Sequence, residues 1–116
     1  MRKEHPLSPE RERLVCMLNA LGNPVRLQIM EYLSECGTCI TNQIVERTPL
    51  AQSTVSQHLK VLREAELIEG AIEGPATCYC INREAIAWLR ETLNQWTTTC
   101  CEKPCGCVKT ESKETI

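Results

Sequence analysis

The 116-residue chain contains no phenylalanine and only two tryptophans and two tyrosines. Its core must therefore be built from leucine, isoleucine, valine and methionine. No apolar run approaches the roughly 20 residues that a membrane-spanning helix needs. The first residues, "MRKEHPLSPERER", lack the apolar segment of a secretory signal. We therefore expect one small cytoplasmic domain without a membrane partner.

An excess of positive charge is also missing, since the net charge is −2 and the isoelectric point is about 5.7. A nucleic-acid-binding surface would have to be a local patch. Cysteine, in contrast, is abundant, with nine residues. In a reducing compartment, clustered cysteines indicate metal binding or redox sensing rather than a disulfide framework.

Hydrophobic spacing and helix-start signals divide the chain into five helical segments and one hairpin. Ser8-Pro9 and Asn23-Pro24 each pair a capping residue with a proline at the first helical position. Leu14, Leu18 and Leu21 recur at helical spacing in the first segment. Residues 67–81 alternate and contain glycines and a proline, which predicts two short strands around a turn. The order predicts a mainly α winged helix-turn-helix with a small β-hairpin.

The last helix, predicted over residues 83–96, carries a narrow apolar stripe. Ile86, Leu89, Leu93 and Trp96 are spaced three, four and three apart. Such a stripe either packs inside the domain or forms a coiled-coil-like contact with a second copy. We favour the second interpretation, because the stripe is long for so small a domain.

Two segments at their expected separation resemble the ArsR/SmtB family of metal-responsive bacterial repressors. They are "LGNPVRLQIMEYL" and "QSTVSQHLKVLREAELI", and the likeness covers about residues 20–81. The resemblance implies a DNA-binding repressor, not an enzyme, that forms a homodimer through its first and last helices. Each protomer would place its helix-turn-helix in the major groove of a palindromic operator. Ala51 departs from the family, which usually has a capping serine there.

The second segment supplies the candidate DNA contacts on the polar side of a helix whose other side is Val55, Leu59 and Leu62. The simpler alternative is that this polar side only faces solvent, as the polar side of any amphipathic helix does. Hydrogen-bonding side chains could reach base edges or phosphates, and cations could hold phosphates. His58 is interpreted as an anchor of the helix rather than a base-reading residue. The wing has no Arg or Lys between Glu69 and Thr77, so its contribution should be small. The candidates are Gln52, Ser53, Thr54, Ser56, Gln57, His58, Lys60 and Arg63, with Arg47 as a further phosphate contact.

For the effector, the resemblance points to the end of the chain. Some arsenite-responsive members bind through an adjacent cysteine pair at the end of the last helix and a third cysteine beyond it. Here Cys100 and Cys101 form the pair, Cys107 is the third thiol and Cys105 a fourth. Three thiolates suit As(III), with Sb(III) as an alternative, and a fourth keeps Cd(II) and Zn(II) open. We therefore expect a DNA-binding and dimerisation domain over residues 1–99 and an effector-binding tail over residues 100–116.

The remaining cysteines leave other functions open. Cys36 and Cys39 form a C-x-x-C, so a repressor switched by thiol oxidation or persulfide, pairing one of them with Cys100, is the main alternative. Cys78 and Cys80 share one face of a strand. They are either half-buried structural residues or a second thiolate site. A thiol-rich metal buffer is the non-regulatory alternative, although it would need no DNA-reading helix.

Overall fold

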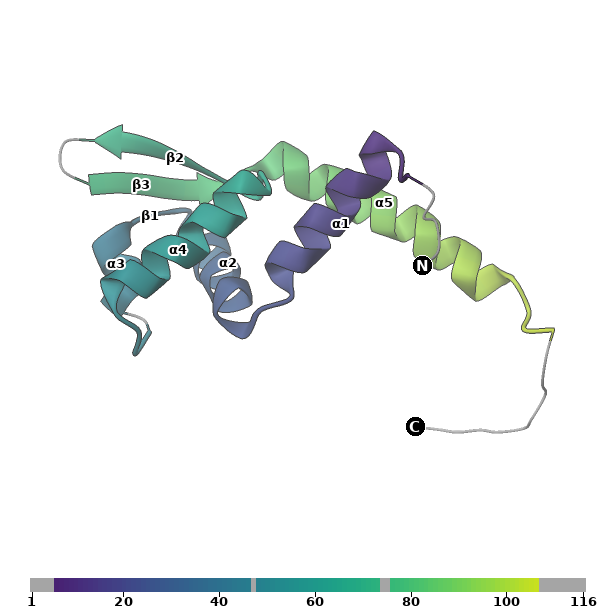
Figure 1. The fold of residues 1–116 in the computed structure, drawn as a ribbon, viewed down its shortest axis with the longest axis horizontal. Helices are drawn as coiled ribbons and strands as arrows, with labels where there is room; N and C mark the ends of the chain where they lie inside the picture. Colours follow the sequence, from purple (N-terminus) through teal and green to yellow (C-terminus); the bar gives the residue numbers. More distant parts are fainter. Residues whose placement is uncertain (1–5, 47, 74–75, 107–116) are drawn as a thin grey trace.

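A computed structural model describes residues 6–46, 48–73 and 76–106 of the chain. It confirms the predicted mainly α winged helix-turn-helix (Figure 1). The elements in chain order are α1 (Pro9–Leu21), α2 (Pro24–Cys36), β1 (Thr38–Ile40), α3 (Thr41–Glu46), α4 (Gln52–Glu64), β2 (Ile68–Glu73), β3 (Ala76–Ile81) and α5 (Arg83–Glu102).

The first two helices begin where their capping signals predict. Ser8 Oγ accepts a hydrogen bond from the Arg11 N–H at 3.2 Å, and Pro9 is the first residue of α1. Asn23 Oδ1 accepts from the N–H groups of Val25 and Arg26 at 2.9 and 3.1 Å. Each cap satisfies N–H groups that have no partner within the helix, and each proline occupies a position where a missing N–H costs nothing.

The wing is part of a three-stranded antiparallel sheet in the order β1-β3-β2. The sequence analysis predicted β2 and β3 but missed β1, because three residues are too few to show an alternating pattern. The register pairs Thr38 with Cys80 and Cys39 with Tyr79. The chain after α2 is thereby tied to the wing, and β3 becomes the central strand.

One apolar cluster joins the helices and the sheet, and leucine, isoleucine, valine and methionine dominate it, as the absence of phenylalanine requires. In α1 the buried residues are Leu14, Met17 and Ala20. Leu18, which shares the helical spacing of Leu14 and Leu21, is 43% exposed. Leu18 lies about 100° around the helix from Met17, so the buried stripe passes beside it.

Helix α5 runs to Glu102, six residues farther than predicted from the apolar stripe. The Thr97 and Thr99 hydroxyls donate to the carbonyls of Leu93 and Gln95 at 2.7 and 3.2 Å within this extension. The stripe ends at Trp96, but the first residue that opposes a helix is Pro104. The predicted boundary between residues 99 and 100 therefore falls inside α5. In Figure 1 this last part of α5 projects beyond the rest of the molecule.

Candidate nucleic-acid interface and thiol cluster

The inward face of α4 holds this helix against the core. Val55, Leu59 and Leu62 each have 0% of their surface exposed. The predicted stripe of three residues is therefore confirmed. Helices α3 and α4 pack together as the two helices of the helix-turn-helix, at one end of the molecule (Figure 1).

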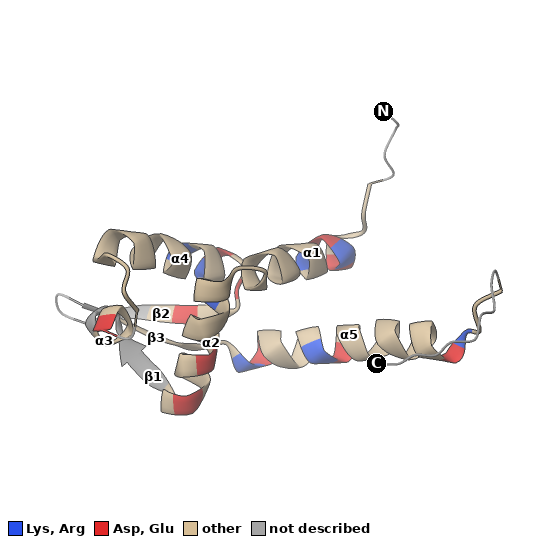
Figure 2. Ribbon diagram, turned by 90° about the horizontal axis from the view of Figure 1, so that it is seen from below, with Lys and Arg blue, Asp and Glu red and all other residues tan. Residues whose placement is uncertain are grey.

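The outward face of α4 presents most of the predicted DNA contacts to solvent. Thr54 and His58 are half-buried, and Arg47 lies outside the described residues. Figure 2 shows basic segments on α4 and acidic segments on α2 and α3. The cations of α4 are Lys60 and Arg63, and Glu64 follows them at the end of the helix. The exposed side chains are Gln52, Ser53, Ser56, Gln57, Lys60 and Arg63.

Helix α4 begins without a side-chain cap. Ala51 has an extended backbone, with φ −68° and ψ 156°, and makes no capping hydrogen bond through its side chain. The first N–H groups of α4 consequently have no partner of the kind that Ser8 and Asn23 provide for α1 and α2. Such N–H groups and the positive end of the helix dipole favour an anion such as a phosphate.

His58 makes a side-chain contact with another helix. Its Nδ1 lies 3.3 Å from Nη1 of Arg26 in α2. This contact fits the interpretation of His58 as an anchor. The sequence motifs contained both residues, but nothing in their spacing of 32 positions indicated that they meet.

The predicted effector thiols gather at the far end of α5. Cys100 and Cys101 lie in its last turn, and both are exposed, as is Cys105 beyond Pro104. Cys107 lies outside the described residues. Neighbouring helical residues point about 100° apart, so the two adjacent thiols cannot face one ion while the turn is intact.

Over residues 6–46, 48–73 and 76–106, no three Cys, His, Asp or Glu side chains are grouped as a metal site. Three of the four predicted thiols thus lie close together in the sequence, but in the structure their sulfur atoms do not surround a common point. The donor set itself suits a soft ion, because thiolates are soft ligands.

The other cysteines are distributed over the rest of the fold. Cys16 is exposed on α1, next to the buried Met17. Cys36 is exposed at the end of α2. Cys78 and Cys80 are half-buried, two residues apart on one face of β3, as their spacing predicted.

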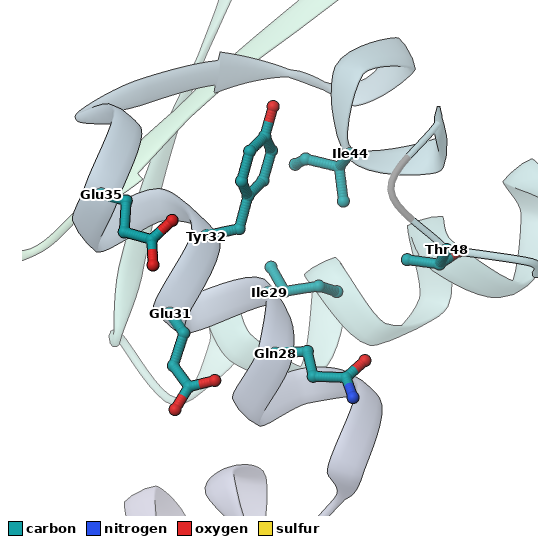
Figure 3. A pocket seen from close by; sticks show the side chains of 7 residues that line it. All are labelled: Gln28, Ile29, Glu31, Tyr32, Glu35, Ile44 and Thr48. Atoms are coloured by element: carbon teal, nitrogen blue, oxygen red, sulfur yellow. The ribbon is translucent and has the colours of Figure 1, made fainter.

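A hollow of about 350 Å³ lies between α2 and α3 (Figure 3). The figure shows the ring of Tyr32 beside Ile44, with the side chains of Glu31 and Glu35 also lining the hollow. None of its seven lining residues is a cysteine or a histidine. The hollow is therefore separate from both the outward face of α4 and the thiols.

Both α1 and α5 carry exposed apolar side chains. Val15 and Leu18 on α1 are 53% and 43% exposed, and Trp96 on α5 is 54% exposed. The two helices also contact each other, with the Arg13 guanidinium 4.4 Å from the ring centre of Trp88. None of the described helices is long and apolar enough to cross a bilayer.

Comparison with known proteins gives a consistent result. Residues 23–69 match the family described as bacterial regulatory protein, arsR family. The chain is 29% identical to an arsenical resistance operon repressor of Staphylococcus xylosus, over 89% of this chain and 96% of that protein. It is 30% identical to the HTH-type transcriptional regulator YgaV of Escherichia coli, over 75% of this chain and 88% of that protein.

Solved structures agree in fold. A crystal structure of an ArsR family transcriptional regulator superposes with a TM-score of 0.73 at 17% identity, covering 84% of this chain and all of that one. HlyU from Vibrio cholerae superposes with a TM-score of 0.63 at 26% identity, covering 78% of this chain and 99% of that one.

Proposed function

The chain belongs to the arsR family of bacterial regulatory proteins, which are DNA-binding transcriptional regulators and not enzymes; on this premise we propose that it represses a metalloid-resistance operon and leaves its operator when As(III) binds the thiols at the end of α5. The observation that carries the proposal is the exposure of Cys100, Cys101 and Cys105 where α5 ends. The arsenical resistance repressor among its relatives supports this choice of effector.

The outward face of α4 is the proposed operator-reading surface. Gln52, Ser53, Ser56 and Gln57 supply hydrogen bonds near the start of the helix, where a recognition helix meets base edges. Lys60 and Arg63 lie nearer its end and supply phosphate contacts. The uncapped first turn of α4 adds N–H groups for a further phosphate.

Of the apolar stripe predicted on the last helix as a dimer contact, Leu89 is buried within the protomer and Trp96 is exposed. The proposed dimer contact therefore consists of exposed apolar residues of α1 and α5. Val15, Leu18 and Trp96 would lose their contact with water when two copies pair. Pairing also places two copies of α4 at a set distance, which a palindromic operator requires. The projecting end of α5 would lie next to this contact, so a change there can reach the dimer geometry.

The effector step rests on how the last turn of α5 must change. Bound As(III) would supply a centre that takes three thiolates, and Cys100 and Cys101 can both reach it only if the turn between Thr97 and Glu102 opens. Pro104 and Gly106 allow the following residues to fold back. Cys107, or Cys105 in its place, would complete the set. The opened turn alters the end of the dimer helix, and a coupling free energy of about 1–3 kcal/mol would be enough for derepression.

The test is a titration of arsenite against the protein bound to operator DNA from its own promoter region. We expect the wild type to release DNA at about one As(III) per protomer. Cys100→Ser, Cys101→Ser and Cys107→Ser should bind the operator normally and fail to release it. Cys16→Ser, an exposed cysteine on α1, is the matched control and should respond like the wild type. Normal release by all the tail variants would show that the effector site lies elsewhere.

The same variants distinguish thiol oxidation from ion binding. Cys36 and Cys100 are both exposed, which keeps a redox or persulfide response open. A hydroperoxide or polysulfide that releases DNA with a matching mass change, while arsenite does not bind, would replace As(III) as the effector. Tight binding of Cd(II) or Zn(II) that needs Cys105 as well would indicate a four-thiolate site instead.

A further inference from the structure

The guanidinium of Arg26 lies between three helices. Its Nε donates to the carbonyl of Ala20 at 2.6 Å and its Nη2 to the carbonyl of Asn19 at 3.4 Å, both at the end of α1. Its Nη1 lies 3.3 Å from Nδ1 of His58 in α4. One side chain of α2 therefore contacts the last turn of α1 and the side of α4 at the same time.

The backbone that carries this side chain is also held. Asn23 Oδ1 accepts from the N–H of Arg26 at 3.1 Å, and Pro24 restricts the first turn of α2. The guanidinium has five donors in one plane and no acceptor, so Nδ1 of His58 has to be the acceptor. The contact depends on a planar fork, which a lysine cannot reproduce.

His58 is well placed to control the rotation of α4 about its own axis. Leu59 and Val55 hold the inward face by apolar contact, which has no preferred direction. A hydrogen bond is directional, and it acts on the residue next to Gln57, which is exposed on the proposed DNA-reading face. A small rotation of α4 would move Gln57 and Ser56 relative to base edges.

We infer that Arg26 is a positioning residue that sets the orientation of α4 relative to α1, and with it the geometry in which two protomers read an operator. The inference rests on the proposed function, because α1 carries the proposed dimer contact and α4 the proposed DNA contacts. Arg26 itself acts through His58 and the end of α1, not by touching DNA. Both residues occur in the two segments that carry the family resemblance, 32 positions apart.

The test compares operator and non-specific DNA binding of the full-length dimer over a range of salt concentrations. Arg26→Met keeps an unbranched apolar side chain and removes the guanidinium with its donors. It should weaken operator binding by about ten- to a hundredfold, as expected for lost hydrogen bonds of a charged group, with non-specific binding unchanged. Arg26→Lys should weaken operator binding to a similar extent, because lysine keeps the charge but not the planar fork of guanidinium donors.

A double-mutant cycle and a phosphate-contact control complete the experiment. His58→Leu should weaken operator binding similarly, and adding Arg26→Met to it should cost little more. Lys60→Met should instead weaken both kinds of DNA and lower the slope of log K against log salt by about 0.9 per contact. The Arg26 variants should leave that slope unchanged.

Three outcomes would overturn the inference. A reduced salt slope in Arg26→Met would mean that Arg26 touches phosphate, and full operator affinity in Arg26→Lys would mean that charge alone matters. Additive losses of operator affinity in the double variant would mean that Arg26 does not act through His58. If Arg26→Met does not fold as a dimer, His58→Leu alone must reproduce the selective operator loss. A wild type that binds no operator would instead refute the proposed function, and the inference with it.

Discussion

We expect the side chain of Ala51 to limit the stability of α4. It stands at the start of α4 with the extended backbone of a capping residue, and it has no side-chain acceptor. Ser8 and Asn23 occupy the same position in α1 and α2, and each accepts hydrogen bonds from the first turn. The weak start of α4 thus follows from one residue type at one position.

Replacing Ala51 with serine should stabilise the protein. A serine hydroxyl at this position can accept from the N–H groups of the first turn, which contributes about 1 kcal/mol to the free energy of unfolding. Urea unfolding at one fixed protein concentration measures the change, since pairing makes stability depend on concentration. Ala51→Val, which adds size but no acceptor, is the control. Equal stability of the serine and valine variants would mean that capping does not limit this helix.

At the scale of the element, α4 has two faces with different tasks. Its inward residues are fully buried, while Gln57 and its polar neighbours are exposed. Substitutions one or two positions apart should therefore separate folding from DNA binding.

Leu59→Ala and Gln57→Ala form the corresponding pair of tests. Leu59→Ala removes a fully buried side chain and should lower the free energy of unfolding by about 2–5 kcal/mol, through lost burial and a cavity. Gln57→Ala should change stability by less than about 0.5 kcal/mol and weaken operator binding. Chemical unfolding and fluorescence anisotropy with labelled operator measure the two effects. Strong destabilisation by Gln57→Ala would contradict its assignment to an exposed reading face.

At the scale of the whole molecule, the proposed dimer depends on apolar residues that one copy leaves exposed. Trp96→Glu places a charge in the proposed contact and should convert the dimer to monomer, with a large loss of operator affinity. Sedimentation velocity measures the mass. Thr98→Glu, two residues farther along α5 and also exposed, points about 200° away and should leave the dimer intact. Dissociation by Thr98→Glu alone would place the contact on the opposite side of α5.

How much of this molecule could be predicted depends on the range of the interactions involved. Ser8, Asn23 and the Val55-Leu59-Leu62 stripe were correctly interpreted from the sequence, because caps and helix faces depend on residues within one or two turns. The positions of β1 and the end of α5 were not. A strand of three residues exists only through its partner β3, and no pattern marks it in advance.

The sequence by itself determined the order of the helices and the wing, the polar and apolar sides of α4, and the family, since short-range spacing encodes all of them. Only the tertiary structure decided that Leu18 and Cys16 face outward, that Cys100 and Cys101 stand on an intact helical turn, and that Arg26 meets His58. The positions of Leu18 and Cys16 and the contact between Arg26 and His58 depend on how helices distant in the sequence pack against one another, whereas Cys100 and Cys101 lie on the part of α5 that projects beyond the rest of the molecule. In α1, where apolar residues occur on more than one side, packing decides which of them face the core, and the periodicity of that segment alone does not determine the choice.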